Sequence, residues 1–95
     1  MRITDFEKYI DRETLRKGLK YYNEGRINFS DYDEDMQMFQ AEVQGSEIYD
    51  THIRFEDGNI METYCSCPVV GLWKHTASLL YEIKHDDFLL EAAME

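Results

Sequence analysis

Apolar positions recur at helical spacing at both ends of the chain and at alternate positions between them. Residues 4–7, Thr-Asp-Phe-Glu, have the pattern of a capping box and predict a short first helix. Asp11 predicts the N-cap of a longer helix, and Gly25 marks its end. One face of that helix comprises Leu15, Gly18, Leu19 and Tyr22. An N-terminal helical region is therefore expected over residues 4–24.

Between residues 26 and 67 the apolar period falls to two, which is typical of half-buried strands. Ile27 and Phe29 predict a first strand. An acidic segment that follows predicts a solvated loop, with Asp31, Asp33, Glu34 and Asp35. The second strand is expected to carry Phe39, Ala41 and Val43 on one face. A phase slip at residues 38–39 indicates a bulge there.

A third strand follows a tight Gly-Ser turn. Its shared face is expected to carry Tyr49, Thr51, Ile53 and Phe55. Asp57-Gly58 is a strong signal for a two-residue hairpin loop. The last strand is expected to run from Ile60 to about Cys67, where Pro68 stops it.

Helical spacing returns near Leu72, so a C-terminal helical region is expected over residues 72–93. Its buried stripe is expected to comprise Leu72, Thr76, Leu79, Leu80 and Ile83. His75 lies at the edge of that stripe, in the first turn. Residues 85–87, His-Asp-Asp, are expected to break the helix, and residues 88–94 can form a short final one.

These elements predict an α+β fold in a single domain, residues 1–95. It comprises an N-terminal helix, an antiparallel sheet of three to four strands, and a C-terminal helix packed on the hairpin. The chain is 43% hydrophobic, enough for one modest core. No apolar run approaches the roughly 20 residues of a membrane helix. Because the start also lacks the apolar segment of a signal peptide, a cytoplasmic protein is expected.

The charge of the chain is acidic and unevenly distributed. There are 10 Lys and Arg against 20 Asp and Glu, a net charge of −10. Residues 31–63 account for −9 of this, whereas residues 1–30 carry +2. The acidity argues against a protein whose main task is to bind nucleic-acid phosphates. The basic residues that share the first long helix are Arg12, Arg16, Lys17 and Lys20.

Two cysteines and one histidine form the pattern with the clearest chemistry. Cys65 and Cys67 lie two residues apart, so in a strand they project from the same side. His75 reaches them if the last long helix folds back onto the hairpin. Zinc is typically bound by four thiolates or imidazoles in a tetrahedron. Because strand geometry holds the two sulfurs too far apart for one ion, Cys67 would have to leave the strand. The alternative is two ordinary buried thiols and a histidine at a helix edge.

The surroundings of these residues resemble the SWIM zinc finger, whose pattern is Cys-x-Cys and then Cys-x-His on a β-β-α unit. The chain reads Cys-Ser-Cys-Pro at residues 65–68 and Trp-Lys-His-Thr-Ala-Ser-Leu-Leu at residues 73–80. Upstream, Arg-Lys-Gly-Leu-Lys-Tyr-Tyr and Gly-Arg-Ile at residues 16–27 are similar to the prelude of the finger in the bacterial branch. The resemblance spans residues 12–81. It implies Cys65, Cys67 and His75 as ligands of Zn²⁺.

Trp73 stands where the family has its third cysteine, and an indole nitrogen cannot ligate zinc. Three interpretations follow. The site is degenerate and metal-free with Trp73 as part of the core, or it holds zinc with water or a substitute side chain. In the third, Trp73 is an engineered change or a loss specific to one branch.

The hairpin register suggests two substitutes for the missing ligand. If Asp57-Gly58 is the loop, His52 faces Thr63 and Asp50 faces Cys65. Directly paired residues lie on one face of a sheet, so both side chains would share the cysteine face. His52 and Asp50 are therefore candidates for the fourth ligand, although an exposed histidine and aspartate on a solvated strand is the alternative.

The resemblance implies a non-enzymatic interaction module, of the kind found N-terminal in Swi/Snf-type helicases, where DNA or protein binding is implied. The larger parent protein would then be a helicase or ATPase. The acidity favours a protein partner, or an adjacent domain of the same chain. The alternative function is direct binding of nucleic acid through the basic face of the N-terminal helix. No small-molecule substrate is evident, because the chain has no glycine loop for phosphate and no marked partner for a nucleophilic cysteine.

Overall fold

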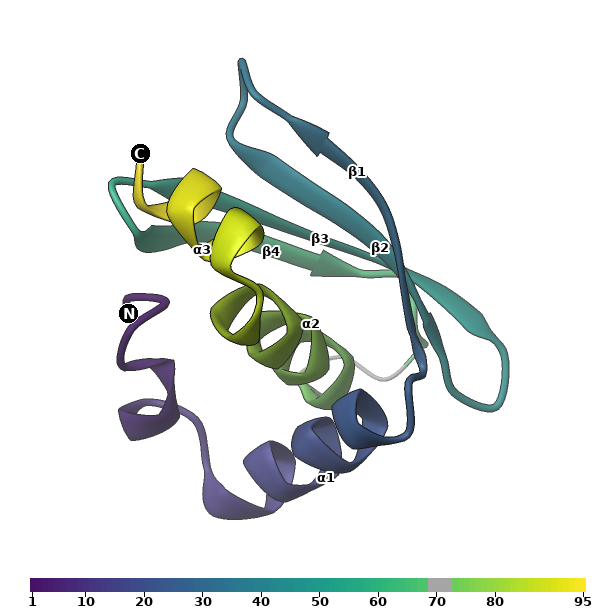
Figure 1. Cartoon of the computed structure of the whole chain (residues 1–95). Helices are drawn as coiled ribbons and strands as arrows, with labels where there is room; N and C mark the ends of the chain where they lie inside the picture. Colours follow the sequence, from purple (N-terminus) through teal and green to yellow (C-terminus); the bar gives the residue numbers. More distant parts are fainter. Residues whose placement is uncertain (69–72) are drawn as a thin grey trace.

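The computed structural model describes residues 1–68 and 73–95 (Figure 1). The elements are η1 (Phe6–Lys8), α1 (Arg12–Asn23), β1 (Ile27–Asp33), β2 (Met38–Gln44), β3 (Ile48–Glu56), β4 (Asn59–Cys65), α2 (Lys74–His85) and α3 (Asp87–Met94). The four strands pair in the order β1-β2-β3-β4, each antiparallel to the next. The expected α+β architecture, with an antiparallel sheet between N-terminal and C-terminal helices, is confirmed.

The N-terminal region contains one regular helix, and it begins where the sequence predicts. The Asp11 carboxylate accepts a hydrogen bond from the backbone N–H of Thr14 at 3.1 Å and another from its hydroxyl at 2.6 Å. The predicted capping box at residues 4–7 is wrong, because the first helical turn is the short 3-10 helix η1 and no side chain caps it. The Asp5 carboxylate instead accepts from the backbone N–H of Arg2, which precedes it.

The alternation of buried and exposed residues along the middle strands matches the prediction. Phe39, Ala41 and Val43 of β2 are buried, as are Tyr49, Thr51, Ile53 and Phe55 of β3. The predicted bulge at residues 38–39 is wrong, since Met38 pairs regularly with Arg54. The irregularity lies in β1, between Phe29 and Asp31. Asp31 therefore belongs to a strand and not to the expected loop.

The hairpin between β3 and β4 forms as expected at its loop but not along its length. Asp57 and Gly58 have φ values of 50° and 80°, the left-handed conformations that a tight hairpin loop requires. Beyond the loop, the register shifts between the Arg54 and Phe55 pairs, which leaves Met61 as an additional residue in β4. The strand ends at Cys65, two residues earlier than predicted.

Helix α2 lies at the centre of the molecule, against the inner face of the sheet and against α1 (Figure 1). Its buried residues are His75, Thr76, Ala77, Ser78, Leu79, Leu80, Tyr81 and Ile83. The contact with α1 is close, because a methyl group placed on Gly18 would lie 2.7 Å from the Ala77 side chain. The predicted start near Leu72 falls outside the described residues.

The C-terminal break is confirmed: α2 ends at His85, and the Asp86 carboxylate caps α3 through the N–H groups of Phe88 and Leu89. Both helices lie on the same side of the sheet as α1 (Figure 1). The core fills the space between, with Ile3, Phe6, Phe39, Ala41, Ile53, Phe55, Leu79, Leu80, Tyr81, Ile83 and Ala93. The opposite face of the sheet carries no helix of the described part of the chain.

Candidate metal centre

Cys65 and Cys67 lie where β4 ends and the chain turns away from the sheet. Cys65 is the last residue of the strand. The next residue, Ser66, is fixed to β3: its backbone N–H donates to the Asp50 carbonyl, and its hydroxyl accepts from the Asp50 N–H, both at 2.9 Å. These two bonds anchor the chain at the point where Cys67 leaves the strand. Both cysteines are half-buried.

His75 enters the group from the first turn of α2. Its side chain is only 2% exposed and stacks on the Tyr49 ring, with centroids 4.8 Å apart. The Tyr21 ring of α1 lies 5.6 Å away on centroids. The sequence places His75 at the edge of a buried stripe, and it is fully within the interior because α1 covers that edge as well. Its Nδ1 atom lies 3.4 Å from Cys65 Sγ.

The geometry of Cys65, Cys67 and His75 suits a metal ion. Their three ligand atoms all lie within 4.8 Å of one another. With bonds of about 2.3 Å to sulfur and 2.0–2.1 Å to nitrogen, a tetrahedral zinc ion separates a sulfur from a nitrogen by roughly 3.6 Å. The 3.4 Å between Cys65 Sγ and His75 Nδ1 is close to that edge. Two thiols and an imidazole are also the donors that zinc prefers, so the residues fit this ion.

The surroundings of His75 favour the protonation state that binds metals. Burial lowers the pKa of the imidazole, and the positive charge of Lys74 lowers it further. The ring is therefore neutral at neutral pH, as a metal ligand must be. Nδ1 faces the cysteines, whereas Nε2 is buried and has no hydrogen-bond partner among the described residues. A methyl group on Gly45 would lie 3.2 Å from Nε2, so the backbone at Gly45 lies close to that side of the ring.

Thr51 belongs to this group, and the sequence reasoning missed it. The observed register pairs Thr51 with Cys65, so both side chains point to the inner face of the sheet. The Thr51 hydroxyl donates to Cys65 Sγ at 3.7 Å, and the threonine is completely buried. The alternation of residues 49–55 correctly places Thr51 on the inner face, but only the bulge at Met61 brings it opposite the cysteine.

The register prediction for His52 and Asp50 is wrong. His52 pairs with Tyr64, and their rings lie 5.4 Å apart on centroids. Both candidates therefore lie on the face of the sheet opposite to the cysteines. The shift of one residue at the β4 bulge is the cause, because a single-residue slip moves a side chain to the other face. Neither residue joins the metal-binding group.

Trp73 does not fill the space between the candidate ligands. It is the N-cap residue of α2 and is half-buried. Its side chain lines a cleft of about 240 Å³ at the start of α1, whose lining comprises Met1, Tyr9, Ile10, Asp11, Thr14 and Trp73. The three ligand atoms are too close together to hold an indole between them.

The basic residues of α1 are partly neutralised by acidic neighbours. The Arg16 guanidinium donates two hydrogen bonds to Glu13, at 2.6 and 3.1 Å, and Lys17 Nζ lies 4.0 Å from the same carboxylate. The hydrogen bond from Arg16 lowers the pKa of Glu13, so this carboxylate is ionised at neutral pH. Arg12 and Lys20 are exposed.

Comparisons with protein-family models, curated proteins and solved structures found no match to the chain. Among the described residues, no helix is both long enough and apolar enough to cross a membrane. The chemistry of the candidate metal centre and the charge of the surface are therefore the evidence for its function.

Proposed function

We propose that this chain is a SWIM-like zinc-binding module with no enzymatic activity of its own, serving contacts with a protein or with an adjacent domain. One observation carries the metal-binding part of the proposal. Cys65, Cys67 and His75 come from three different places, the end of β4, the following segment and the first turn of α2, yet their ligand atoms lie within 4.8 Å. The distance between Cys65 Sγ and His75 Nδ1 is close to the sulfur–nitrogen separation in a zinc tetrahedron, which supports zinc as the ion.

Metal analysis of the purified chain tests this part. After dialysis against buffer without chelator, we expect one equivalent of zinc in the unmodified chain and none in Cys65→Ser or Cys67→Ser. His52→Gln is the matched control, because His52 lies on the opposite face and should keep the ion. Zinc content that is unchanged by either cysteine substitution, or absent from a folded chain exposed to zinc, would contradict the proposal.

The partner part of the proposal is supported by the open face of the sheet. The residues on this face pair across the strands and alternate with the buried ones. Its acidic members are Asp31, Asp33, Glu42, Asp50, Glu56 and Glu62. Among the described residues of the face, Arg54 is the basic counterpart, and it already contacts Glu62 at 3.4 Å. Such a surface attracts a basic protein surface and repels nucleic acid.

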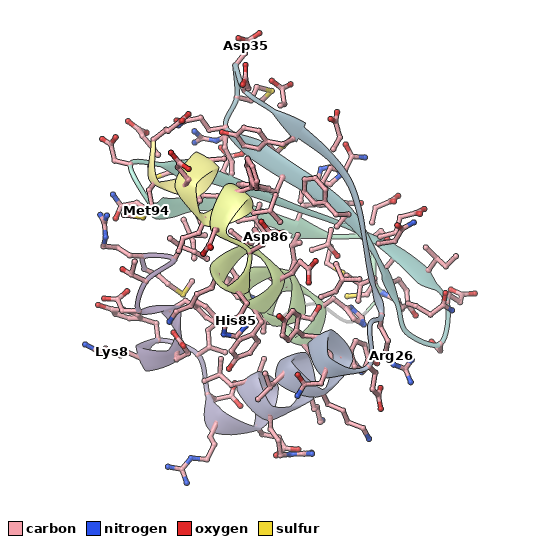
Figure 2. The ribbon with its side chains drawn as sticks, in the orientation of Figure 1. Lys8, Arg26, Asp35, His85, Asp86 and Met94 are labelled. Atoms are coloured by element: carbon pink, nitrogen blue, oxygen red, sulfur yellow. The ribbon has the colours of Figure 1, made fainter. Side chains whose placement is uncertain are left out.

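Figure 2 shows Asp35 at the outer tip of the β1–β2 hairpin, which extends the acidic region beyond the sheet. Arg26 lies at the opposite end of β1. Its guanidinium donates to the Glu24 carboxylate at 2.6 Å and to the Gln44 carbonyl at 3.1 Å. Arg16, Lys17 and Arg26 thus have acidic partners nearby, which makes direct nucleic-acid binding the weaker of the two functions.

Backbone chemical shifts in the presence of a lysine- and arginine-rich peptide test the partner part. We expect shifts on the open face, and we expect Glu42→Lys with Asp50→Lys to abolish them. Arg12→Glu with Lys20→Glu is the matched control on α1 and should leave the peptide shifts in place. If double-stranded DNA shifts α1 residues instead, and the α1 variant removes that effect, the nucleic-acid alternative replaces the proposal.

A further inference from the structure

The candidate metal centre supplies three protein ligands, whereas zinc in proteins takes four. Among the described residues, the group of possible ligands consists of Cys65, Cys67 and His75. The residues between the two described segments are Val69, Val70, Gly71 and Leu72, whose side chains carry no donor atom for a metal. Position 73 carries an indole that lines a separate cleft. The protein side chains therefore leave one position of a tetrahedron unfilled.

The direction of that position follows from what surrounds the three ligands. The side of the His75 ring that carries Nε2 is buried near the backbone at Gly45, and the ring stacks on Tyr49. Cys65 Sγ accepts a hydrogen bond from the hydroxyl of Thr51. Both cysteines are half-buried, whereas His75 is 2% exposed, so the cysteine side of the group is the one nearer to solvent. An additional ligand is expected to approach from that side.

The donor set of the group favours a further ligand with a soft donor atom. Two thiolates and a neutral imidazole balance the charge of a divalent ion, so a further thiolate gives the same charge as three cysteines and a histidine. Thiolate is also a preferred ligand of zinc. Resting on the metal-binding function proposed above, we propose that the bound ion keeps one exchangeable coordination position, and that this position takes a thiolate from outside the chain. The thiol loses its proton to solvent as the sulfur–metal bond forms.

The chain loaded with Co²⁺ in place of zinc tests this inference by spectroscopy. Substoichiometric Co²⁺ is added first, and charge-transfer absorption from sulfur to cobalt is expected from the two cysteines. Titration with 2-mercaptoethanol is then expected to raise this absorption per cobalt by about half and in a saturable way, because three thiolates replace two. Trp73→Cys should show the higher absorption without added thiol and should not respond to it.

Trp73→Phe is the control for this experiment, since it removes the indole without adding a sulfur and should behave as the unmodified chain does. It also serves if Trp73→Cys fails to fold. If cobalt gives charge-transfer absorption that thiol does not change, the position is closed and this inference is wrong, while the metal-binding function stands. If cobalt gives no such absorption, the metal-binding function fails and the inference fails with it.

The thiol can be a small molecule or a cysteine of a partner, and the same readout separates the two. A basic peptide that contains one cysteine is compared with the same peptide containing serine. If the cysteine peptide saturates the absorption change at concentrations at least about tenfold below those of 2-mercaptoethanol, the position serves a partner side chain. Equal concentrations for both thiols assign it to a small molecule.

Discussion

Thr51 is the residue whose substitution reports most directly on the candidate metal centre without removing a ligand. Its hydroxyl donates to Cys65 Sγ and orients the sulfur. Hydrogen bonds of this kind commonly contribute about 10–100-fold to metal affinity. Thr51→Val keeps the shape of the buried side chain, so we expect weaker zinc binding by about that factor with little change in fold. Competition with a chromophoric chelator measures it.

Thr63→Val is the matched control, because Thr63 lies on the same strand as Cys65 and pairs with Ile53 on the inner face. Its substitution should leave the zinc affinity within about twofold, since it removes no bond to a metal ligand. Equal losses of affinity in the two variants would show that general destabilisation, and not the bond to Cys65, determines the result.

The sequence predicts the candidate ligands of this site better than it predicts their neighbours. Cys65, Cys67 and His75 are visible in the sequence because their chemistry and spacing are distinctive. The contact of Thr51 with Cys65 is not visible, because the pairing of these two residues depends on an additional residue in β4. Met61 is apolar and lies next to Ile60, just as Met38 lies next to Phe39, where no bulge forms, so adjacent apolar residues do not locate the bulge. A one-residue error in register then exchanges the two faces of the strand, which is why Asp50 and His52 were expected near the cysteines.

At the scale of the elements, the packing of α1 against α2 depends on the absence of a side chain at Gly18. A methyl group there would lie 2.7 Å from Ala77 Cβ and 3.1 Å from the Ser78 backbone nitrogen. Gly18→Leu is therefore expected to reduce the free energy of unfolding by about 3 kcal/mol, at the upper end of overpacking costs. Lys20→Leu, on the exposed face of α1, should change it by no more than about 0.5 kcal/mol. Urea denaturation followed by circular dichroism measures both values.

The N-terminus of α1 gives a prediction of pH dependence. Hydrogen bonds from Thr14 lower the pKa of the Asp11 carboxyl below its ordinary value of 3.8. Because the folded-state pKa is the lower one, the ionised cap stabilises the folded chain above the unfolded-state pKa. This stabilisation is lost as the pH falls through the folded-state value.

Asp11→Asn separates this effect from the other carboxylates, because asparagine is an equally good N-cap and does not titrate. We expect similar thermal stability of the two chains at pH 7. Below pH 3.8 the unmodified chain should lose the contribution of its cap, while the variant keeps its own. A difference between the two chains that does not change with pH would show that ionisation of Asp11 contributes nothing.

The elements themselves are largely predictable, whereas the surroundings of α2 are not. Apolar spacing identifies α1, the four strands and the break after His85 because each has one buried face or a clear cap. Helix α2 is buried on several sides at once, between the sheet and α1. The small residues Ala77 and Ser78 permit this, yet in the sequence they are indistinguishable from a moderately polar helix face. The full burial of His75 follows from that packing.

At the scale of the whole molecule, the structure divides the charge between two sides. The net charge of −10 is concentrated on the sheet and its hairpins, while the helices and core lie on the other side. The sequence locates the acidic segment but assigns Asp31 and Asp33 to a loop. Their place in β1 puts them on the same face of the sheet as Glu42, Asp50, Glu56 and Glu62. This is why a basic partner is expected to meet the sheet, not a loop.

Metal binding at the candidate centre is expected to link the stability of the whole chain to metal concentration. It joins the end of β4 to α2, and α2 contacts the sheet, α1 and α3. An ion that binds only the folded state stabilises it by RT ln(1 + [metal]/Kd). Above the Kd, each tenfold rise in free zinc should therefore add about 1.4 kcal/mol to the free energy of unfolding. Thermal or urea unfolding in zinc buffers measures this slope.

Cys65→Ser with Cys67→Ser should show a slope near zero and match the unmodified chain in excess chelator. A wild-type chain whose stability is independent of zinc would refute the link, because binding to the folded state alone cannot leave the unfolding equilibrium unchanged.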